Sequence, residues 1–326
     1  MKAPAFWAED GFLARLLTPL TLPYRAVGAT RRHFASPRDA GIPVICVGNL
    51  VAGGAGKTPV ALSLGSRLGS MGRAFAFLTR GHGGSLPGPI QVKFGKHAPR
   101  EVGDEALLLA EAAPTWVSRD RVAGALAARE AGAELIIMDD GFQNPSLRKT
   151  LSLVVIDGGS GFGNGHVHPA GPLREPIDSG LGRADAVVLV GEDRKQVLAS
   201  LPPRSPVLRA DIVPDLGERL KSRDRVHGFA GIGRPEKFRE SLRQLDLEVA
   251  GFQAFADHHA FTTKELDNLL AAAENAGALL VTTAKDHVRL PEPFKDKVER
   301  VNISLAWRDD VAVNRLLDRI SSRGPG

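Results

Sequence analysis

Cysteine is almost absent from this sequence, because Cys46 is the only one in 326 residues. A single cysteine cannot form an intrachain disulfide, and it excludes a zinc site built from cysteine thiolates. Since Cys46 lies inside an apolar run, we expect a small core residue rather than a reactive thiol. The composition fits a reducing compartment such as the cytosol.

Long apolar runs and aromatic residues are also scarce. No segment reaches the roughly 18 consecutive apolar residues that a membrane-spanning helix needs, and Glu9 and Asp10 interrupt the start in a way that does not fit a signal peptide. Only 6% of the residues are aromatic, and no basic run is interleaved with them, which argues against nucleic acid as a partner. The net charge of +5 and the pI near 9.5 favour phosphates or acidic lipid.

The most informative stretch is 42–60, which reads IPVICVGNLVAGGAGKTPV. An apolar run, a glycine-rich turn and leucines at helical spacing predict a strand, a loop and a helix N-terminus, which together make a P-loop. Glycines let backbone N–H groups converge on phosphate oxygens, because no Cβ stands in the way. The expected nucleotide-binding residues are Gly53, Gly54, Ala55, Gly56, Lys57 and Thr58.

Two side chains of this loop have defined tasks. Lys57 would reach the β- and γ-phosphates of ATP, and the Thr58 hydroxyl would bind Mg²⁺. The strict motif has a glycine five residues before Gly56, where this chain has Val51. An ordinary glycine-rich turn is the alternative, but the preceding strand and a later acidic strand end argue against it.

That acidic strand end is the apolar run 135–140, which finishes in Asp139 and Asp140. In a parallel sheet, ligands collect at the carboxyl ends of the strands. The pair therefore fits the Mg²⁺-holding end of a P-loop enzyme. A solvated acidic turn is the alternative interpretation.

Other polar residues allow two interpretations each. Asp104 and Glu105 open a helical stretch, where they can cap the helix, or Asp104 can accept a hydroxyl proton as a base. One imidazole of the pair His258 and His259 could orient or relay protons for a carboxylate, or it could be an ordinary solvated or core histidine. Adjacent histidines point in different directions, which disfavours a paired metal site.

Residues 1–35 differ from the rest of the chain. Apolar residues at helical spacing, interfacial aromatics and a trailing basic cluster describe either a helix in a membrane surface or a helix packed on its own domain. From 36 to 215 apolar runs alternate with helical stretches, which predicts a parallel sheet with helices on both faces. The expected strands are 43–50, 74–80, 134–140, 151–157 and 185–190, and the expected helices are near 59–71, 104–112 and 120–131.

The long loop 158–183 is rich in glycine and proline, and a loop of this length usually serves a site. Its histidines, His166 and His168, are expected to form loop hydrogen bonds. Residues 202–225 read as a connection. The alternation then resumes, so that 216–326 forms a smaller second α/β domain after the core domain 36–215.

Taken together, these segments resemble the bacterial lipid A 4′-kinase (tetraacyldisaccharide 4′-kinase) family. The matching blocks occur in the family's order across nearly the whole chain. They are VGNLVAGGAGKTP (47–59), LTRGHGG (78–84), VGDEALLL (102–109), MDDGFQN (138–144), GPLREP (171–176), FAGIGRPEKF (229–238), FADHHAF (255–261) and VTTAKDHVRL (281–290).

The resemblance implies a P-loop kinase that uses ATP and Mg²⁺ to phosphorylate the 4′-hydroxyl of a tetraacylated disaccharide 1-phosphate. It implies two α/β/α domains joined by a two-stranded linker, and an N-terminal helix bound to the cytoplasmic face of the inner membrane. The membrane interpretation of 1–35 is therefore favoured. We expect a monomeric protein.

The resemblance also carries residue roles. It implies that Asp104 acts as base with His258, and that Asp140 holds the metal together with Thr58. It places further residues along the site as substrate or supporting contacts, namely Arg80, Glu105, Asp139, Gln143, Asn144, Glu175 and Asp257. Because His258 belongs to the second domain, domain closure would complete the site.

The sequence departs from the family pattern at three positions: Asn144 replaces a histidine, His82 a tyrosine and Ala284 a glutamate. Asn144 can form hydrogen bonds but cannot carry the charge of an imidazolium. None of the three changes removes Lys57 or Asp104, so we expect an active enzyme with altered substrate contacts.

Two rival functions remain open. A membrane-bound partitioning or transport ATPase would carry a second lysine just before the paired glycines, where this chain has Ala52. A nucleotide-switched membrane adaptor would bind ATP without transferring phosphate. Incubation with ATP and candidate acceptors separates these functions from a glycolipid kinase.

Overall fold

The computed structural model describes residues 4–203, 205–216, 220–221 and 223–321. The chain divides into two compact units. The larger unit comprises Ala3–His97, Glu101–Asp211 and Leu305–Gly326, and the smaller unit consists almost wholly of Ile212–Ser304. The predicted domain boundaries near 35 and 215 stay a prediction, although the contacts group the residues after 304 with the larger unit.

The larger unit is built on a sheet with strand order β8-β7-β6-β1-β5-β2-β4-β3. All neighbouring pairs are parallel except β3 and β4. Its strands are β1 (Val44–Gly48), β2 (Phe75–Thr79), β3 (Ile90–Gln91), β4 (Thr115–Val117), β5 (Leu135–Asp139), β6 (Leu151–Asp157), β7 (Ala186–Val190) and part of β8 (Val207–Asp215).

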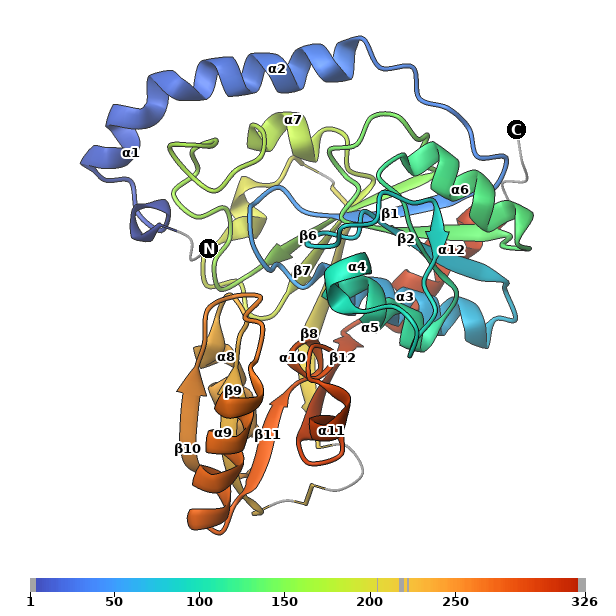
Figure 1. The fold of residues 1–326 in the computed structure, drawn as a ribbon. Helices are drawn as coiled ribbons and strands as arrows, with labels where there is room; N and C mark the ends of the chain where they lie inside the picture. Colours follow the sequence, from blue (N-terminus) through green and yellow to red (C-terminus); the bar gives the residue numbers. More distant parts are fainter. Residues whose placement is uncertain (1–3, 204, 217–219, 222, 322–326) are drawn as a thin grey trace. The chain divides into compact units, whose positions relative to one another are not determined.

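Helices cover both faces of this sheet, as predicted (Figure 1). On one face Ile45 and Val47 pack with α3 (Lys57–Ser70), α5 (Asp104–Ala112) and α12 (Asp310–Ser321). The alternate residues Val44 and Cys46 face α6 (Arg121–Glu130) and α7 (Ile177–Leu181). Burial raises the pKa of the Cys46 thiol to about 11, in keeping with a core residue.

The N-terminal segment is helical and packs on the larger unit at its start. It contains η1 (Ala5–Trp7), α1 (Phe12–Leu17), η2 (Thr18–Leu20) and α2 (Thr21–His33). Asn164 Nδ2 donates to the carbonyl of Phe6, and the Trp7 indole donates to the carbonyl of Pro169. The side chain of His168 lies between Trp7 and Tyr24, and His166 Nε2 lies 3.2 Å from Asp10.

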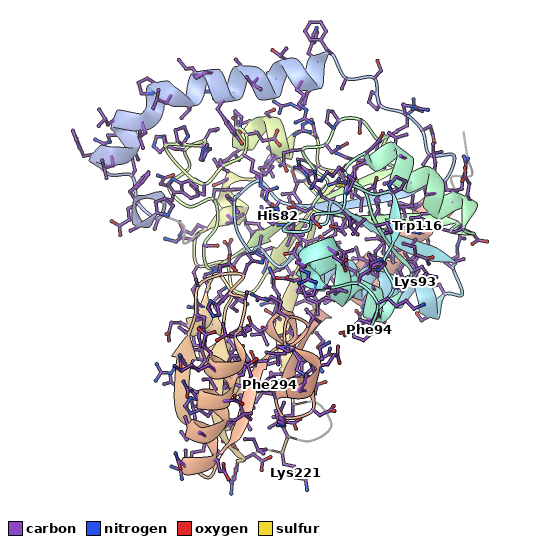
Figure 2. The ribbon with its side chains drawn as sticks, in the orientation of Figure 1. His82, Lys93, Phe94, Trp116, Lys221 and Phe294 are labelled. Atoms are coloured by element: carbon purple, nitrogen blue, oxygen red, sulfur yellow. The ribbon has the colours of Figure 1, made fainter. Side chains whose placement is uncertain are left out.

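The smaller unit has its own parallel sheet in the order β10-β9-β11-β12. Its strands are β9 (Arg225–Ala230), β10 (Glu248–Ala254), β11 (Leu279–Thr283) and the greater part of β12 (Glu299–Trp307). One face packs on α8 (Pro235–Gln244), and the other on α9 (Thr263–Asn275) and α11 (Glu292–Lys295), which contributes the buried Phe294 (Figure 2). The remaining short helices of the chain are α4 (Pro99–Val102), η3 (Val197–Ser200) and α10 (Ala284–His287).

The fold class is confirmed, while three strands escaped the sequence analysis. The region 202–225 contains β8 rather than only a connection, because its mixed burial pattern resembles a polar linker. Strands β3 and β4 are too short to show a period. Within the part of the chain that the structure describes, no helix is both long enough and apolar enough to span a membrane.

Candidate active site

The turn after β1 has the backbone geometry of a P-loop. α3 begins at Lys57 directly after Gly56, whose φ of 90° lies in the left-handed region, and Gly53 has a φ of 116°. Glycine adopts such angles without steric cost. The first turn of α3 thus directs its N–H groups and its partial positive charge toward this loop, which suits bound phosphate.

Val51, which stands where the strict motif has glycine, is paired with the segment 172–174. Val51 forms an isolated antiparallel bridge with Leu173, and the Ala52 N–H donates to the Pro172 carbonyl over 2.7 Å. The backbone of Arg174 in turn donates to Leu50. The backbone of 172–174 therefore pairs with the start of the P-loop, and the partly buried Val51 side chain packs against the hydrophobic core.

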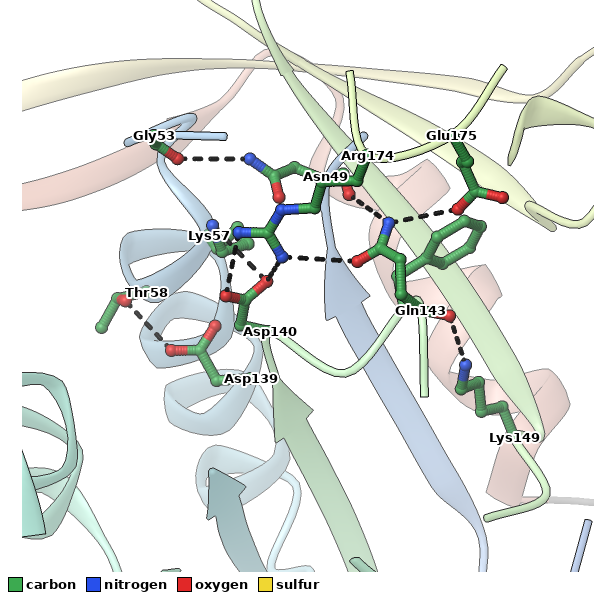
Figure 3. A network of polar contacts seen from close by, with 11 residues as sticks. Asn49, Gly53, Lys57, Thr58, Asp139, Asp140, Gln143, Lys149, Arg174 and Glu175 are labelled. Carbon is green, nitrogen blue, oxygen red and sulfur yellow. Dashed lines mark hydrogen bonds and ion pairs between the residues drawn. The ribbon is translucent and has the colours of Figure 1, made fainter. Parts of the chain in front are cut away.

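The acidic pair reaches the same edge of the sheet because β5 lies beside β1, with Val47 opposite Asp139. The Thr58 hydroxyl donates to Asp139 Oδ2 over 3.0 Å (Figure 3). The side chain of Asp139 is almost fully buried, and its Oδ1 has no hydrogen-bond partner. Burial, together with the nearby Glu105 carboxylate, raises the pKa of Asp139 above its ordinary value.

Asp140 has different surroundings from its neighbour. Its Oδ1 lies 3.7 Å from Lys57 Nζ, and Arg174 donates to its two oxygens over 3.0 and 3.4 Å. Burial would raise the pKa of Asp140, but the two cations outweigh burial and hold it below its ordinary value. Asp140 is therefore the charged carboxylate of the pair.

Arg174 is a site residue that the sequence analysis did not select. It directly precedes Glu175 in the GPLREP block, so the signal was an arginine within a motif already recognised. Besides Asp140 it contacts Gln143 Oε1 at 3.4 Å. The planar guanidinium of Arg174 carries several N–H donors, so it can bind a carboxylate and a phosphate oxygen at the same time.

Gln143 and Glu175 extend the network away from the P-loop (Figure 3). Gln143 Nε2 donates to the Asn49 carbonyl over 2.9 Å and to Glu175 Oε1 over 3.2 Å. The buried carboxylate of Glu175 is paired with Arg183 and lies 3.6 Å from Arg32, the penultimate residue of α2. Glu175 thus links this network to α2 through its contacts with Gln143 and Arg32.

The remaining predicted residues of the larger unit lie on other elements. Asp104 is buried in the first turn of α5, after Gly103, whose φ is 88°. Arg80 directly follows β2 and is exposed. The buried Arg121, also missed from sequence, has a pKa lowered to about 10 by burial and by Arg80. Positive charge is therefore concentrated near Asp140, as an anionic ligand requires.

The three departures from the family pattern differ in their surroundings. Asn144 Oδ1 accepts from the backbone and hydroxyl of Ser146, so it closes a local turn. His82 is exposed in the turn after β2 (Figure 2). Ala284 is the first residue of α10, which Thr283 caps by accepting from the Asp286 N–H.

In the smaller unit the two adjacent histidines have separate surroundings. His259 Nε2 contacts Glu265 at 3.1 Å, and its ring stacks on Phe255. His258 has a φ of 59°, and its Nε2 lies 3.8 Å from Asp257. His259 is thus held beside the hydrophobic core of its unit by Glu265 and Phe255, and the role of His258 stays a prediction.

Comparison with known proteins identifies the family. Residues 13–321 match the family described as LpxK, tetraacyldisaccharide-1-P 4′-kinase. The chain belongs to this family. The tetraacyldisaccharide 4′-kinase of Rhodospirillum centenum is 53% identical, over 97% of this chain and 96% of that one. The enzyme of the same name from Gluconacetobacter diazotrophicus is 52% identical over 98% of both chains.

A solved structure of the family shows the same fold. The crystal structure of LpxK from Aquifex aeolicus, an "apo" form in complex with ATP, superposes with a TM-score of 0.77. Its sequence is 27% identical, and the match covers 95% of this chain and 99% of that one. A family member of this fold thus binds ATP, which agrees with the P-loop geometry found here.

Proposed function

We propose that this protein is an ATP-dependent kinase that phosphorylates the 4′-hydroxyl of a tetraacyldisaccharide 1-phosphate, a precursor of lipid A. The observation that carries the proposal is a P-loop whose Lys57 and Thr58 contact paired aspartates, in a chain 53% identical to a tetraacyldisaccharide 4′-kinase over nearly its whole length. Phosphoryl transfer needs charge neutralisation and alignment, which such a site supplies.

The residues around Thr58 fit Mg²⁺. Asp139 Oδ1 is buried without a hydrogen-bond partner, and a hydroxyl and two carboxylates are the hard oxygen ligands that this ion prefers. Thr58, Asp139 and Asp140 would hold the ion, which widens the predicted pair of Thr58 and Asp140. When bound, Mg²⁺ neutralises negative charge on the β- and γ-phosphate oxygens.

The chain's own residues divide the remaining tasks. The P-loop amides and Lys57 bind and orient the phosphates, and Arg174 adds positive charge beside Asp140. Asp104 accepts the proton of the sugar hydroxyl, and His258 supports Asp104 in that role. Arg80, Glu105, Gln143, Asn144, Glu175 and Asp257 contribute substrate or supporting contacts.

One test separates this function from its rivals. Purified protein is incubated with γ-labelled ATP, with and without a tetraacyldisaccharide 1-phosphate in mixed micelles. A kinase transfers label to the lipid, whereas an ATPase releases labelled phosphate without the acceptor. An adaptor would do neither at a useful rate, and either of these last two outcomes would reject the proposal.

The protonation of Asp139 leads to a stability prediction. Because its folded-state pKa is raised to about 7, its ionisation lowers the stability of the folded protein progressively between the ordinary carboxyl pKa of 3.8 and about pH 7, and the loss is complete above that pH. Asp139→Asn should therefore raise Tm by about 1–3 °C at pH 8 without Mg²⁺, and by much less near pH 4. It should also weaken Mg²⁺-dependent transfer.

Calorimetry at both pH values, followed by a Mg²⁺ titration of activity, checks this expectation. Asp185→Asn is a suitable control, because Asp185 contacts the Ser152 backbone away from the P-loop. A lower Tm for Asp139→Asn at pH 8 would show that the Asp139 charge stabilises the site instead.

We also propose that the protein binds the cytoplasmic face of the inner membrane through α1 and α2. Large apolar side chains of these two helices are exposed, Phe12 by 79%, Leu16 by 61% and Val27 by 68%. Arginines accompany them along the helices and attract anionic headgroups. An amphipathic helix of this type lies in the interface without spanning the bilayer.

Replacing Phe12 and Leu16 together with serine should lower binding to anionic vesicles by more than tenfold. Full burial of each large apolar side chain contributes about 1.5–3 kcal/mol, and one 1.4 kcal/mol step is about tenfold in binding. Co-sedimentation with phosphatidylglycerol vesicles measures the change. Met71→Ser, an exposed apolar position after α3, is the control, and equal losses in both proteins would contradict membrane binding by α1.

A further inference from the structure

A buried ion pair lies beneath the turn that carries His258. The turn follows β10, and the residues beneath it follow the neighbouring strands β9 and β11. The Asp286 side chain is 0% exposed and the Arg289 side chain 5% exposed, with Oδ1 and Nη2 2.6 Å apart. Neither residue has a role in the proposed reaction, so their contacts require another explanation.

His258 has a backbone conformation that its neighbours must maintain. Its φ of 59° lies in the left-handed region, which a non-glycine residue occupies only when surrounding contacts hold it there. The His258 N–H donates to the Gly231 carbonyl over 3.0 Å. Gly231 is therefore one of the residues that hold the His258 backbone in this conformation.

Arg289 holds both ends of this arrangement. Its Nη2 donates to the same Gly231 carbonyl over 3.0 Å, and its Nη1 donates to the His259 carbonyl over 3.2 Å. The guanidinium of Arg289 thus binds two carbonyls, that of Gly231, which accepts from the His258 N–H, and that of His259, the residue after His258. A lysine has a single point of charge and cannot satisfy both carbonyls in this geometry.

Asp286 binds the N–H group of Gly231, whose carbonyl is bound by Arg289. Its Oδ1 accepts from the Gly231 N–H over 3.1 Å as well as from Arg289, while its Oδ2 accepts from the Thr283 hydroxyl over 2.7 Å. A Cβ on Gly231 would meet Asp286 Oδ1 at 3.1 Å and the Ala256 carbonyl at 3.2 Å. Both polar backbone groups of Gly231 are therefore bound to the ion pair at close range.

The imidazoles of His258 and His259 have different surroundings. His259 is held through its side chain by Glu265 and by the Phe255 ring. The His258 side chain is 39% exposed, with its Nε2 3.8 Å from Asp257. Because the His258 N–H is bonded to the Gly231 carbonyl, a shift of that carbonyl would move the His258 backbone and its ring with it.

We propose that Asp286 and Arg289 are positioning residues, which set the orientation of the His258 imidazole through Gly231. The inference rests on the proposed catalytic role of His258. In this proposal the pair acts through Gly231 rather than on the substrate. The Asp286–Arg289 pair should therefore affect kcat only while His258 is present. A pair that merely stabilised the fold would affect kcat equally with and without His258.

A double-mutant cycle tests the inference in the full-length protein. Arg289→Gln should lower kcat for lipid phosphorylation by about tenfold, since small displacements of a catalytic group cost one to two orders of magnitude. KM for ATP should remain unchanged, because the P-loop belongs to the larger unit. In a His258→Ala background the same substitution should lower kcat by less than about twofold.

Two further variants guard against a folding artefact. Thr283→Val removes the hydroxyl that donates to Asp286 and disturbs the pair more mildly, so a smaller loss of kcat with the same dependence on His258 is expected. Leu242→Ala removes a buried side chain of α8 from the hydrophobic core of the same unit. It should lower Tm, but any effect on kcat should not depend on the presence of His258.

Each outcome decides the matter. If Arg289→Gln and Thr283→Val leave kcat unchanged, or if their effects multiply with that of His258→Ala, the positioning role is overturned while the kinase assignment stands. If His258→Ala itself leaves kcat unchanged, the catalytic role of His258 fails and the positioning role fails with it.

Discussion

Asp104→Asn is expected to lower kcat by about 10²–10⁴-fold, the usual contribution of a general base. The substitution preserves the shape of the side chain and its place in the first turn of α5. An amide cannot accept the proton of the sugar hydroxyl, so the loss falls on the chemical step. KM for ATP should change by less than about threefold, because the P-loop residues are untouched.

His258→Ala should lower kcat in the same direction, because the imidazole supports Asp104 in the proposed mechanism. Initial rates over a range of both substrates measure the two parameters separately. Glu111→Gln, in the last turn of the same helix, controls for a change of charge on α5. Unchanged kcat values in both Asp104→Asn and His258→Ala would remove the proposed base and its supporting histidine.

Lys57→Ala is expected to reduce kcat/KM by about 10²–10³-fold, which is the usual cost of removing one preorganised donor that stabilises charge in the transition state. Lys57 is only 10% exposed, and its ammonium lies 3.7 Å from Asp140 at the start of α3. Little water can replace it at this depth. The β- and γ-phosphates would then lose their most direct positive charge during transfer.

The comparison with Lys93→Ala makes the result specific. Lys93 is an exposed lysine of the same unit (Figure 2), so its removal changes the net charge equally without affecting the P-loop. Both proteins should show normal far-UV circular dichroism. Near-normal transfer by Lys57→Ala would mean that the phosphates bind elsewhere on the protein.

The sequence pattern and the structure agree most closely where the signal is local. The P-loop turn, the expected strands and the helices on both faces follow from short-range patterns of glycine and apolar residues, and the structure contains them. β8 was missed because a strand with alternating exposed residues and a proline resembles a linker. The departure at Val51 was visible in the sequence, but its bridge to Leu173 was not.

The candidate site shows the same division. The motifs identified Asp139 and Asp140 as a pair, yet their different environments depend on Glu105, Lys57 and Arg174, which are distant in sequence. No periodicity predicts which carboxylate is buried beside a hydroxyl and which is paired with cations. Arg174 was overlooked for this reason, although it lies inside a recognised block.

By itself, the sequence determined the P-loop, the alternation of strands and helices, and the family, because these properties are written in residues close together along the chain. Only the tertiary structure decided that Thr58 contacts Asp139, that Arg174 contacts Asp140, and that Arg289 reaches the loop of His258. Such contacts arise where parallel strands bring their carboxyl ends to one edge, and that arrangement depends on strand order rather than on local pattern.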